Sequence, residues 1–376
     1  MHLKSLTVIN FKSFKQLELE FDPKINCFVG DNGQGKTNLL DAIYYLSMCK
    51  SAFNPSDNQV LNHDEKFFVL QGRYVRKTSD ENIYCGFKQS EGKIFRRNGK
   101  DYERLADHIG FLPVVMVSPA DSALIEESGE ERRKYMNSVI SQFDKVYLDE
   151  IMRYNRALAQ RNSYLKGNHG YTFSYDILEA IDEQLAQYGK IIHAKRQEFI
   201  NQLIPIFQDY YTRVSGGAEV VSLTYRSQLN SNDLHELLRD NVDKDRALQY
   251  TSVGIHRDDI VLNIDGYPIR REGSQGQQKT YLIALKLAQF DFFSRVSEIK
   301  PILLLDDIFD KLDFKRVEQL VRLVAFDGFG QIFITDTNKN RIDEILHRIN
   351  SGYRLFNVES AEVNLQLERR VEDIDE

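Results

Sequence analysis

The chain has 376 residues, of which 42% are hydrophobic and 28% charged, so it is long and apolar enough for two or three folded units. Its net charge of −7 excludes a wholly basic nucleic-acid binder, but it does not exclude a local basic patch. No apolar run approaches the ~20 residues of a membrane span and the N-terminus lacks a signal-peptide core, so we expect no membrane segment. Three cysteines without paired spacing indicate neither a disulfide framework nor a zinc site, which favours a cytoplasmic protein.

The first third of the chain, residues 1–120, is dominated by patterns that predict strands. The short apolar run Ile25–Val29 ends at a glycine-rich loop, and apolar residues at helical spacing over 38–46 predict a helix directly after that loop. Residues 67–104 alternate between apolar and polar side chains and contain two glycine turns, which predicts antiparallel hairpins.

The middle of the chain, from about 121 to 245, changes to helical spacing. Apolar residues recur from 147 to 165, with Arg161 filling one position of the stripe, and a second stripe runs from 177 to 199. Residues 167–170 break the pattern between them. Two stripes around a short break predict an antiparallel helical hairpin with arms of ~20 residues, each roughly 30 Å long. The pattern does not decide between two core helices and a projecting arm.

The last third returns to an α/β pattern. Residues 301–306 form an unbroken apolar run that ends in an aspartate, and residues 331–335 form another. Such runs are typical of strands in a sheet that is covered on both faces. We therefore expect the two ends of the chain to form one discontinuous α/β lobe, with the helical middle as an insertion.

The first motif with a clear chemistry is the glycine-rich loop of Gly30, Asp31, Asn32, Gly33, Gln34, Gly35, Lys36 and Thr37. Its glycines let consecutive backbone N–H groups point at phosphates, and the following helix adds its positive N-terminal end. Lys36 supplies a mobile charge for the β- and γ-phosphates, and Thr37 offers a hydroxyl to Mg²⁺. The pattern predicts a P-loop that binds ATP and Mg²⁺.

The second motif is the acidic pair that ends the apolar run at 301–306. Asp306 is placed to reach the Mg²⁺ shell, and Asp307 to orient or deprotonate an attacking water. A strand that simply ends in solvated carboxylates is the alternative, and the presence of the P-loop makes it less favoured.

The third motif is the stretch Gly273–Lys279, called the signature stretch below, which precedes an apolar helical run over 281–290. Ser274 is placed to cap that helix and to leave backbone N–H groups available to an anion. A plain glycine turn is the alternative interpretation of these residues taken alone.

In this order, the P-loop, the helical insertion, the signature stretch and the acidic pair resemble the ABC-type ATPase head of SMC-like proteins. In that class the serine–glycine signature reaches the γ-phosphate held by a second subunit. The resemblance therefore implies an ATP-dependent homodimer in which four residues act in trans: Ser274, Gln275, Gly276 and Gln277.

More narrowly, the chain resembles the RecF family of bacterial recombination mediators. The stretches that carry this resemblance are residues 9–14, 118–121 followed by 132–133, 254–259 and 275–280. The insertion is far too short for the coiled coil of SMC proteins proper.

This resemblance implies an ABC-type P-loop head with an inserted helical lobe that carries a short antiparallel arm. The expected ATP-binding lobe is 1–118 with 296–376, and the expected helical lobe with the signature stretch is 119–295. The implied function is ATP-dependent binding of duplex DNA near single-strand gaps, as a mediator that helps to load a recombinase in DNA repair and the SOS response. RecR, RecO and RecA are the implied protein partners, and no membrane partner is expected.

The chain departs from the transporter-type ABC pattern at three places. Gly273 and Gln275 replace the leucine and glycine of the transporter signature. Asp307 stands where a glutamate is usual, and residues 335–337 carry no switch histidine. Because aspartate is one methylene shorter, we expect loose geometry for water attack and slow, Mg²⁺-dependent hydrolysis that serves as a switch. An ABC-transporter subunit and an SMC-like ATPase-nuclease are the alternative functions.

A candidate DNA-binding region lies at 66–104, which contains ten Lys/Arg and five Asp/Glu. A strand face with several cations can follow phosphates without reading sequence. The candidate cations are Arg73, Arg76, Lys93, Arg96, Arg97 and Lys100. A solvated sheet edge protected by charge is the alternative.

Two further polar features leave alternatives open. Residues 256–259, His-Arg-Asp-Asp, are either a site that senses nucleotide or a buried ion-pair network beside a strand. Gln71 is a candidate for a Q-loop glutamine, but its place in the predicted hairpins favours a surface glutamine. Asp121 lies nearer the expected junction between the lobes.

Overall fold

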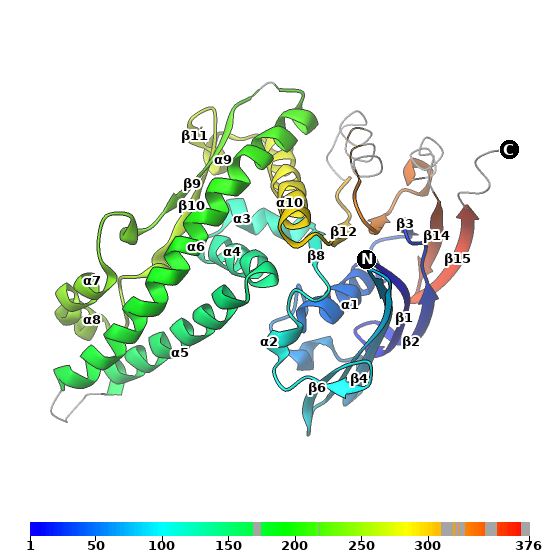
Figure 1. Cartoon of the computed structure of the whole chain (residues 1–376). Helices are drawn as coiled ribbons and strands as arrows, with labels where there is room; N and C mark the ends of the chain where they lie inside the picture. The colour runs from blue at the N-terminus through cyan, green and yellow to red at the C-terminus, as the bar shows by residue number, and fades with distance from the viewer. Residues whose placement is uncertain are drawn as a thin grey trace. The chain divides into compact units, whose positions relative to one another are not determined.

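A computed structural model of the chain describes residues 1–167, 174–217, 219–309, 319, 323, 328–342 and 352–369 (Figure 1). The chain divides into two compact units, the first made of 1–121 and 283–376 and the second of 122–282. Helix α10 (Gln275–Ser297) begins in the second unit and ends in the first. Among the helices of the described ranges, none combines the length and the hydropathy needed to cross a membrane.

The first unit contains an antiparallel sheet of six strands in the order β2-β1-β4-β5-β6-β7. Their bounds are β1 (His2–Phe11), β2 (Phe14–Glu20), β4 (Phe67–Arg76), β5 (Ser79–Lys88), β6 (Gly92–Arg97) and β7 (Lys100–Asp101). The predicted hairpins over 67–104 are confirmed, because β4, β5, β6 and β7 pair antiparallel in chain order.

A second sheet of the first unit has the order β15-β14-β3-β13-β12-β8. Its bounds are β3 (Ile25–Val29), β8 (Val114–Val117), β12 (Ile302–Asp306), β13 (Ile332–Asp336), β14 (Tyr353–Glu359) and β15 (Glu362–Arg369). All neighbours pair in parallel except β14 and β15. As the apolar runs predict, every residue of β3, β12 and β13 is buried. The carboxyl ends of these three strands therefore lie at one edge of the sheet.

Helix α1 (Lys36–Met48) leaves the glycine loop and contacts strands of both sheets. Aromatic rings belong to the same core: Phe28 stacks on Phe356, and Phe21 meets Phe333 edge to face with centroids 5.0 Å apart. Two short helical turns, η1 (Asp57–Val60) and α2 (Leu105–His108), complete this part of the unit. The loop before α1 is thus anchored by a helix that packs against both sheets of the unit.

The second unit is mostly helical. Its helices are η2 (Pro119–Ser122, which starts in the first unit), α3 (Ala123–Glu126), α4 (Gly129–Phe143), α5 (Lys145–Gly167), α6 (Tyr175–Ser215), η3 (Gln228–Asn230), α7 (Leu234–Asp240), α8 (Val242–Leu248), η4 (Ile255–Arg257) and α9 (Ile269–Glu272). A small antiparallel sheet, β9 (Val221–Arg226), β10 (Asp259–Ile264) and β11 (Tyr267–Pro268), accompanies them. The helical character expected from about 121 to 245 is therefore wrong at β9, where burial alternates with the period of a strand.

Helices α5 and α6 form the predicted hairpin and pack side by side (Figure 1). The expected connection at 168–170 lies outside the described residues. The length expected for the second arm is wrong, since α6 has 41 residues and continues through Pro205. Its buried stripe also begins at Leu178, because Ile177 is 51% exposed. Beyond the hairpin, α6 packs on α7 and β9, so much of its length is covered by the second unit itself.

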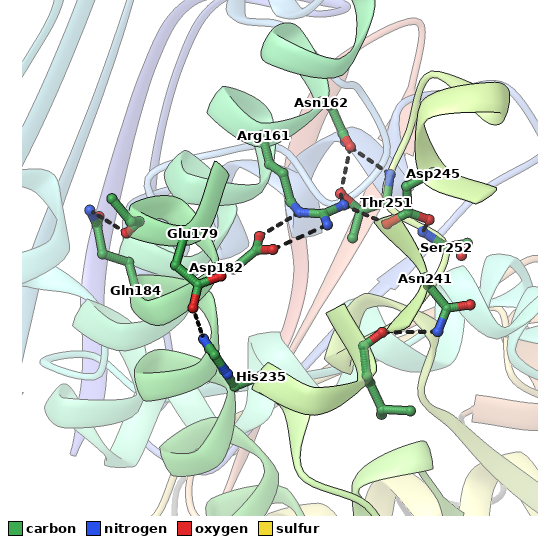
Figure 2. A network of polar contacts seen from close by, with 12 residues as sticks. Arg161, Asn162, Glu179, Asp182, Gln184, His235, Asn241, Asp245, Thr251 and Ser252 are labelled. Carbon is green, nitrogen blue, oxygen red and sulfur yellow. Dashed lines mark hydrogen bonds and ion pairs between the residues drawn. The ribbon is translucent and has the colours of Figure 1, made fainter. Parts of the chain in front are cut away.

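Arg161, which interrupts the apolar stripe of α5, is completely buried at the centre of a polar network (Figure 2). Its Nε donates to Asp182 of α6 at 2.6 Å, and its Nη1 donates to Asp245 of α8 at 2.5 Å. Thr251 accepts from the same guanidinium and is itself held by Asn162. One arginine therefore joins both arms of the hairpin to α8 and the segment after it.

Candidate functional site

The glycine loop connects β3 to α1 and has a backbone that other residues would not adopt. Gly35 is the N-cap of α1 with φ 110°, and a Cβ there would lie 2.9 Å from Ser13 Oγ. A Cβ on Gly30 would lie 2.2 Å from the carbonyl oxygen of Val358. Both glycines are thus required by close packing, and the loop keeps its N–H groups at the start of a helix, where anions are favoured.

Lys36 lies at the first position of α1 and folds back over the loop. Its Nζ donates to the carbonyl oxygens of Gly30 at 2.6 Å and Asp31 at 2.7 Å. Burial lowers the pKa of the ammonium, while the carboxylates of Asp307 and Asp306 raise it. A positive group is therefore held directly against the loop that would receive a phosphate.

Thr37 and Asp306 meet although they are 269 positions apart in the chain. The Thr37 hydroxyl lies 3.0 Å and 2.9 Å from the two carboxylate oxygens of Asp306. Asp306 is 3% exposed, and burial raises its pKa, although hydrogen bonds from Thr335 and Thr37 lower it. The structure brings together two residues that the sequence assigns to the metal.

These two oxygen-bearing side chains suit Mg²⁺, a hard cation that prefers oxygen ligands. No group of three or more His, Cys, Asp or Glu side chains arranged to hold a metal occurs in the described part of the chain. Mg²⁺ characteristically takes one or two protein ligands and completes its shell with phosphate oxygens and water. The donor set of Thr37 and Asp306 fits that pattern.

Thr335 on β13 connects the two acidic residues, and sequence reasoning gave it no such role. Its hydroxyl donates to Asp306 at 2.8 Å and accepts from the backbone N–H of Asp307 at 3.0 Å. Asp307 has φ 46°, a left-handed conformation that a non-glycine residue seldom takes. The strand between β3 and β12 therefore fixes both carboxylates at the carboxyl edge of the sheet.

The turn between β14 and β15 also contacts the P-loop. The sequence does not predict this turn, because it lacks the glycine that usually marks one. Ser360 and Ala361 have φ 51° and 63°, as in the tight turns that usually carry Asn-Gly. Their N–H groups donate to the side-chain and backbone oxygens of Gln34, respectively. On the other side, Ser13 accepts from Asn38 at 2.9 Å. The β14–β15 turn thus holds the loop itself, and Ser13 holds the first turn of the helix that follows it.

The signature stretch begins α10 as a capping box. The Ser274 hydroxyl accepts from the backbone N–H of Gln277 at 3.3 Å, and the Gln277 side chain accepts from the N–H of Ser274 at 2.8 Å. The predicted helix cap is confirmed. Gln275 and Gly276 occupy the first two helical positions, where backbone N–H groups have no partner within the helix. This helix start belongs to the second unit, and the P-loop belongs to the first.

Three residues of the stretch 256–259, namely His256, Asp258 and Asp259, lie in a polar network beside a strand, whereas Arg257 is exposed and lies over the ring of Tyr250. Asp258 is 1% exposed and accepts from Arg196 at 2.9 Å, and Asp259 accepts from Arg132 at 2.6 Å. Burial lowers the pKa of His256 to about 4. These contacts tie α4 and α6 to the start of β10 and give the group a role in holding the second unit together.

Gln71 and Asp121 lie where the sequence predicts them, Gln71 in the hairpins and Asp121 at the boundary between the units. Gln71 is on β4 and donates to Asn82 at an exposed position. Asp121 is the last residue of the first segment of unit 1, accepts from the N–H of Ser118 at 2.8 Å and pairs with Lys286 of α10 at 2.6 Å.

The six candidate DNA-binding cations lie on both faces of the sheet, and their contact with DNA stays a prediction. Strand register places Arg73 and Arg96 on one face. It places the remaining four, Arg76, Lys93, Arg97 and Lys100, on the other. The reason is the two-residue period of a strand, which separates cations that are close in sequence.

Several of these cations also have acidic or aromatic partners. Lys93 pairs with Asp57 at 3.0 Å, and Arg97 pairs with Glu81 at 2.8 Å and lies 3.9 Å from the ring centroid of Phe111. Such contacts stabilise the sheet and reduce the charge presented to a ligand.

The fold and the site together define a class. A P-loop beside an acidic strand end, with a capped signature helix on an inserted helical unit, is the arrangement of an ABC-type ATPase head of the SMC-like kind. The family model described as the RecF/RecN/SMC N terminal domain matches residues 2–363.

The chain belongs to the RecF family. It is 52% identical over 365 residues to the DNA replication and repair protein RecF of Bacteroides fragilis, covering 97% of this chain and 98% of that protein. It is 49% identical over 361 residues to the protein of the same name in Flavobacterium johnsoniae, covering 95% and 100%.

Solved structures agree with this family. A structure of the recombination mediator protein RecF with ATP, in the RecFOR pathway, has a TM-score of 0.88 and 31% identity and covers 97% of this chain and 98% of its own. The Smc head domain of Pyrococcus furiosus with an extended coiled coil has a TM-score of 0.58 and 15% identity, covering 99% and 97%. This second likeness concerns the fold alone.

Proposed function

We propose that this protein is an ATP-dependent recombination mediator, in which ATP joins two copies of the chain on DNA and slow hydrolysis releases them. The observation that carries the proposal is the convergence of Lys36, Thr37 and Asp306 at one sheet edge. The separate capped helix at Ser274 completes the set of groups that such a switch requires. Relatives named DNA replication and repair proteins, and a mediator structure with ATP, support it.

Each residue of the site has a stated task. The loop N–H groups and Lys36 bind the phosphates, and Thr37 with Asp306 holds Mg²⁺. When bound, Mg²⁺ neutralises charge that develops on the phosphate oxygens. Asp307 orients the attacking water or accepts its proton, and Thr335 keeps the backbone of Asp307 in its left-handed conformation.

Hydrolysis is proposed to be slow because the water-orienting group is short and fixed. An aspartate carboxylate reaches about one methylene less far than a glutamate, and misplacement of about 1 Å can cost on the order of a hundredfold in rate. Position 335–337 supplies threonines and an aspartate, without a histidine. A slow rate suits a switch whose bound state must last.

The second copy is proposed to supply Ser274, Gln275, Gly276 and Gln277 to the γ-phosphate. The capping box leaves the first N–H groups of α10 available to an anion, which the helix end favours. The nucleotide then lies between two chains, so its binding and the association of the chains depend on each other.

The proposed nucleic-acid ligand is duplex DNA near a single-strand gap, and RecO, RecR and RecA are the proposed protein partners. The solved mediator structure is placed in the RecFOR pathway, which supports the first two partners. Of the six candidate cations, we retain Arg73 and Arg96, because they share the exposed face of the sheet, where Arg96 also pairs with Asp101.

The test is the mass of the protein in solution, measured by light scattering with and without ATP, alongside binding to gapped and blunt duplexes. Wild type should dimerise with ATP and prefer the gapped duplex. Lys36→Ala should remain monomeric while melting like wild type without nucleotide, and Asp307→Asn should stay dimeric long after ATP is added. Oligomers that form without ATP in both variants would disprove the clamp.

A further inference from the structure

Glu219 lies just before β9 and connects two distant helices through its carboxylate. Its Oε1 accepts from the side-chain amide of Gln277 in the first turn of α10 at 3.0 Å. Its Oε2 accepts from the hydroxyl of Tyr211 near the end of α6 at 3.2 Å. All three residues belong to the second unit, so this connection is internal to that unit.

The Gln277 amide is the intermediate in this chain of contacts. A carboxylate can only accept hydrogen bonds, so the NH₂ end of the amide must point at Glu219. The carbonyl end must then point the opposite way, toward the N–H of Ser274, where it accepts at 2.8 Å. Without the carboxylate, the amide NH₂ loses its acceptor and only the N–H of Ser274 holds the side chain, so the capping box is less firmly fixed.

We propose that Glu219 is a positioning residue for the signature stretch. It fixes the Gln277 amide, and through it the Ser274 backbone and hydroxyl, in the orientation that receives the γ-phosphate of a second copy. This inference rests on the proposed function, because it assigns Glu219 a role in the ATP-joined dimer. The Ser274 hydroxyl already accepts from the N–H of Gln277, so its own hydrogen is left to donate outward.

The charge of Glu219 makes this role distinguishable from simple electrostatics. A carboxylate near an expected phosphate repels it, so its charge alone opposes the joined state. Glu219→Gln removes that charge, keeps a carbonyl acceptor for Gln277 and offers an NH₂ group that the Tyr211 hydroxyl can accept. Glu219→Ala removes both the charge and the acceptor. Positioning predicts that Glu219→Ala weakens the dimer while Glu219→Gln largely retains it, whereas charge alone predicts that both variants strengthen it.

The attachment of α10 to the second unit does not depend on Glu219. The Tyr281 hydroxyl donates to the carbonyl of Ser222 at 2.8 Å, and the Tyr281 ring lies 4.7 Å from that of Phe207 between centroids. Loss of the carboxylate should therefore release the Gln277 amide and leave the helix in place.

The experiment measures three quantities for each variant: ATP affinity of the monomer by titration with a fluorescent ATP analogue at low protein concentration, the Kd of the ATP-bound dimer by light scattering, and the melting temperature. Glu219→Ala should weaken the dimer by about tenfold with ATP affinity and melting unchanged. Glu219→Gln should restore dimerisation to within about threefold of wild type. Glu272→Gln, which removes an exposed charge two positions before Ser274, is the matched control and should behave as wild type.

A double-mutant cycle identifies the path through the amide. In a Gln277→Leu background, Glu219→Ala should have no further effect on the dimer, since its target is gone. Independent, additive effects of the two changes would overturn the proposal. A normal dimer in Glu219→Ala would also overturn it, as would tighter dimers in both Glu219 variants. So would a Glu219→Ala variant that loses melting temperature and ATP affinity together. If wild type itself does not dimerise with ATP, the proposed function fails first, so the two failures are distinguishable.

Discussion

Replacing Arg161 by methionine should unfold the second unit at a much lower temperature. Methionine keeps most of the aliphatic volume but removes the charge and every donor. Asp182 and Asp245, with side chains 3% and 0% exposed, would then lose the cation that both of them contact. Removing one partner of a buried ion pair costs about 3–5 kcal/mol, because the remaining charge is left desolvated.

This free energy converts into a measurable shift. For a unit of about 160 residues, each kcal/mol lowers the melting temperature by about 2–4 °C, so the expected loss is about 6–20 °C. Differential scanning calorimetry measures it directly. The matched control is Arg213→Met on the same hairpin, whose pair with Asp209 is 3.8 Å long and partly exposed, and which should shift melting by at most 2 °C.

Two further measurements decide whether buried charge is the cause. Burial already raises the pKa of Asp182, and loss of the guanidinium should raise it further. A carboxyl with a raised folded-state pKa destabilises the fold as pH rises, so the deficit of the variant should shrink from pH 8 to pH 5. Adding Asp182→Asn and Asp245→Asn should recover much of the loss. A deficit below 2 °C, or one that is independent of pH, would refute the reasoning.

Three other substitutions have defined outcomes. Burial raises the pKa of Asp306, so at pH values above the ordinary pKa of 3.8 its ionised form destabilises the nucleotide-free fold. Asp306→Asn should therefore melt higher than wild type at pH 7, with a smaller gain at pH 5, and should lose the stabilisation by Mg²⁺-ATP. An equal gain in melting temperature at both pH values would contradict this. Burial lowers the pKa of His256 from 6.5 to about 4, so acidification across that range should lower the free energy of unfolding of wild type, measured in urea, by up to about 3 kcal/mol. His256→Gln should flatten this dependence on pH, and an unchanged slope of stability against pH would exclude His256 as its source. Ala361→Gly should relieve the left-handed turn and raise stability by about 0.5–1 kcal/mol after the added chain entropy of glycine, a result that unchanged or lower melting would disprove.

The elements that could be predicted from the sequence are those whose pattern is local. The buried strands β3, β12 and β13 are unbroken apolar runs, and the hairpins of β4 to β6 alternate with a period of two. Helix α6 exceeds the expected ~20 residues because its buried stripe does not stop at Phe199. The stripe in fact continues at Leu203 and Phe207 toward the end of the helix.

The site was predictable where glycine chemistry and strand ends specify it, and not where contacts are long-range. Lys36, Thr37 and Asp306 follow from spacing and from the rule that ligands bind at the carboxyl edge of parallel strands. Thr335 was invisible because nothing in its neighbourhood shows that β13 lies between β3 and β12. The density of cations at 66–104 likewise does not indicate one shared face, because neighbouring residues of a strand point to opposite sides of the sheet.

The unequal lengths of α5 and α6 have a mechanical consequence. With 41 residues, α6 is a rod of about 60 Å, and it runs from the hairpin connection to Tyr211, whose hydroxyl contacts Glu219. A tilt of one degree at one end of such a rod displaces the other by about 1 Å, comparable to the misplacement that can cost on the order of a hundredfold in rate. A partner that binds the α5–α6 hairpin and tilts α6 would therefore displace the contact with Glu219, and through it the capping box of the signature stretch.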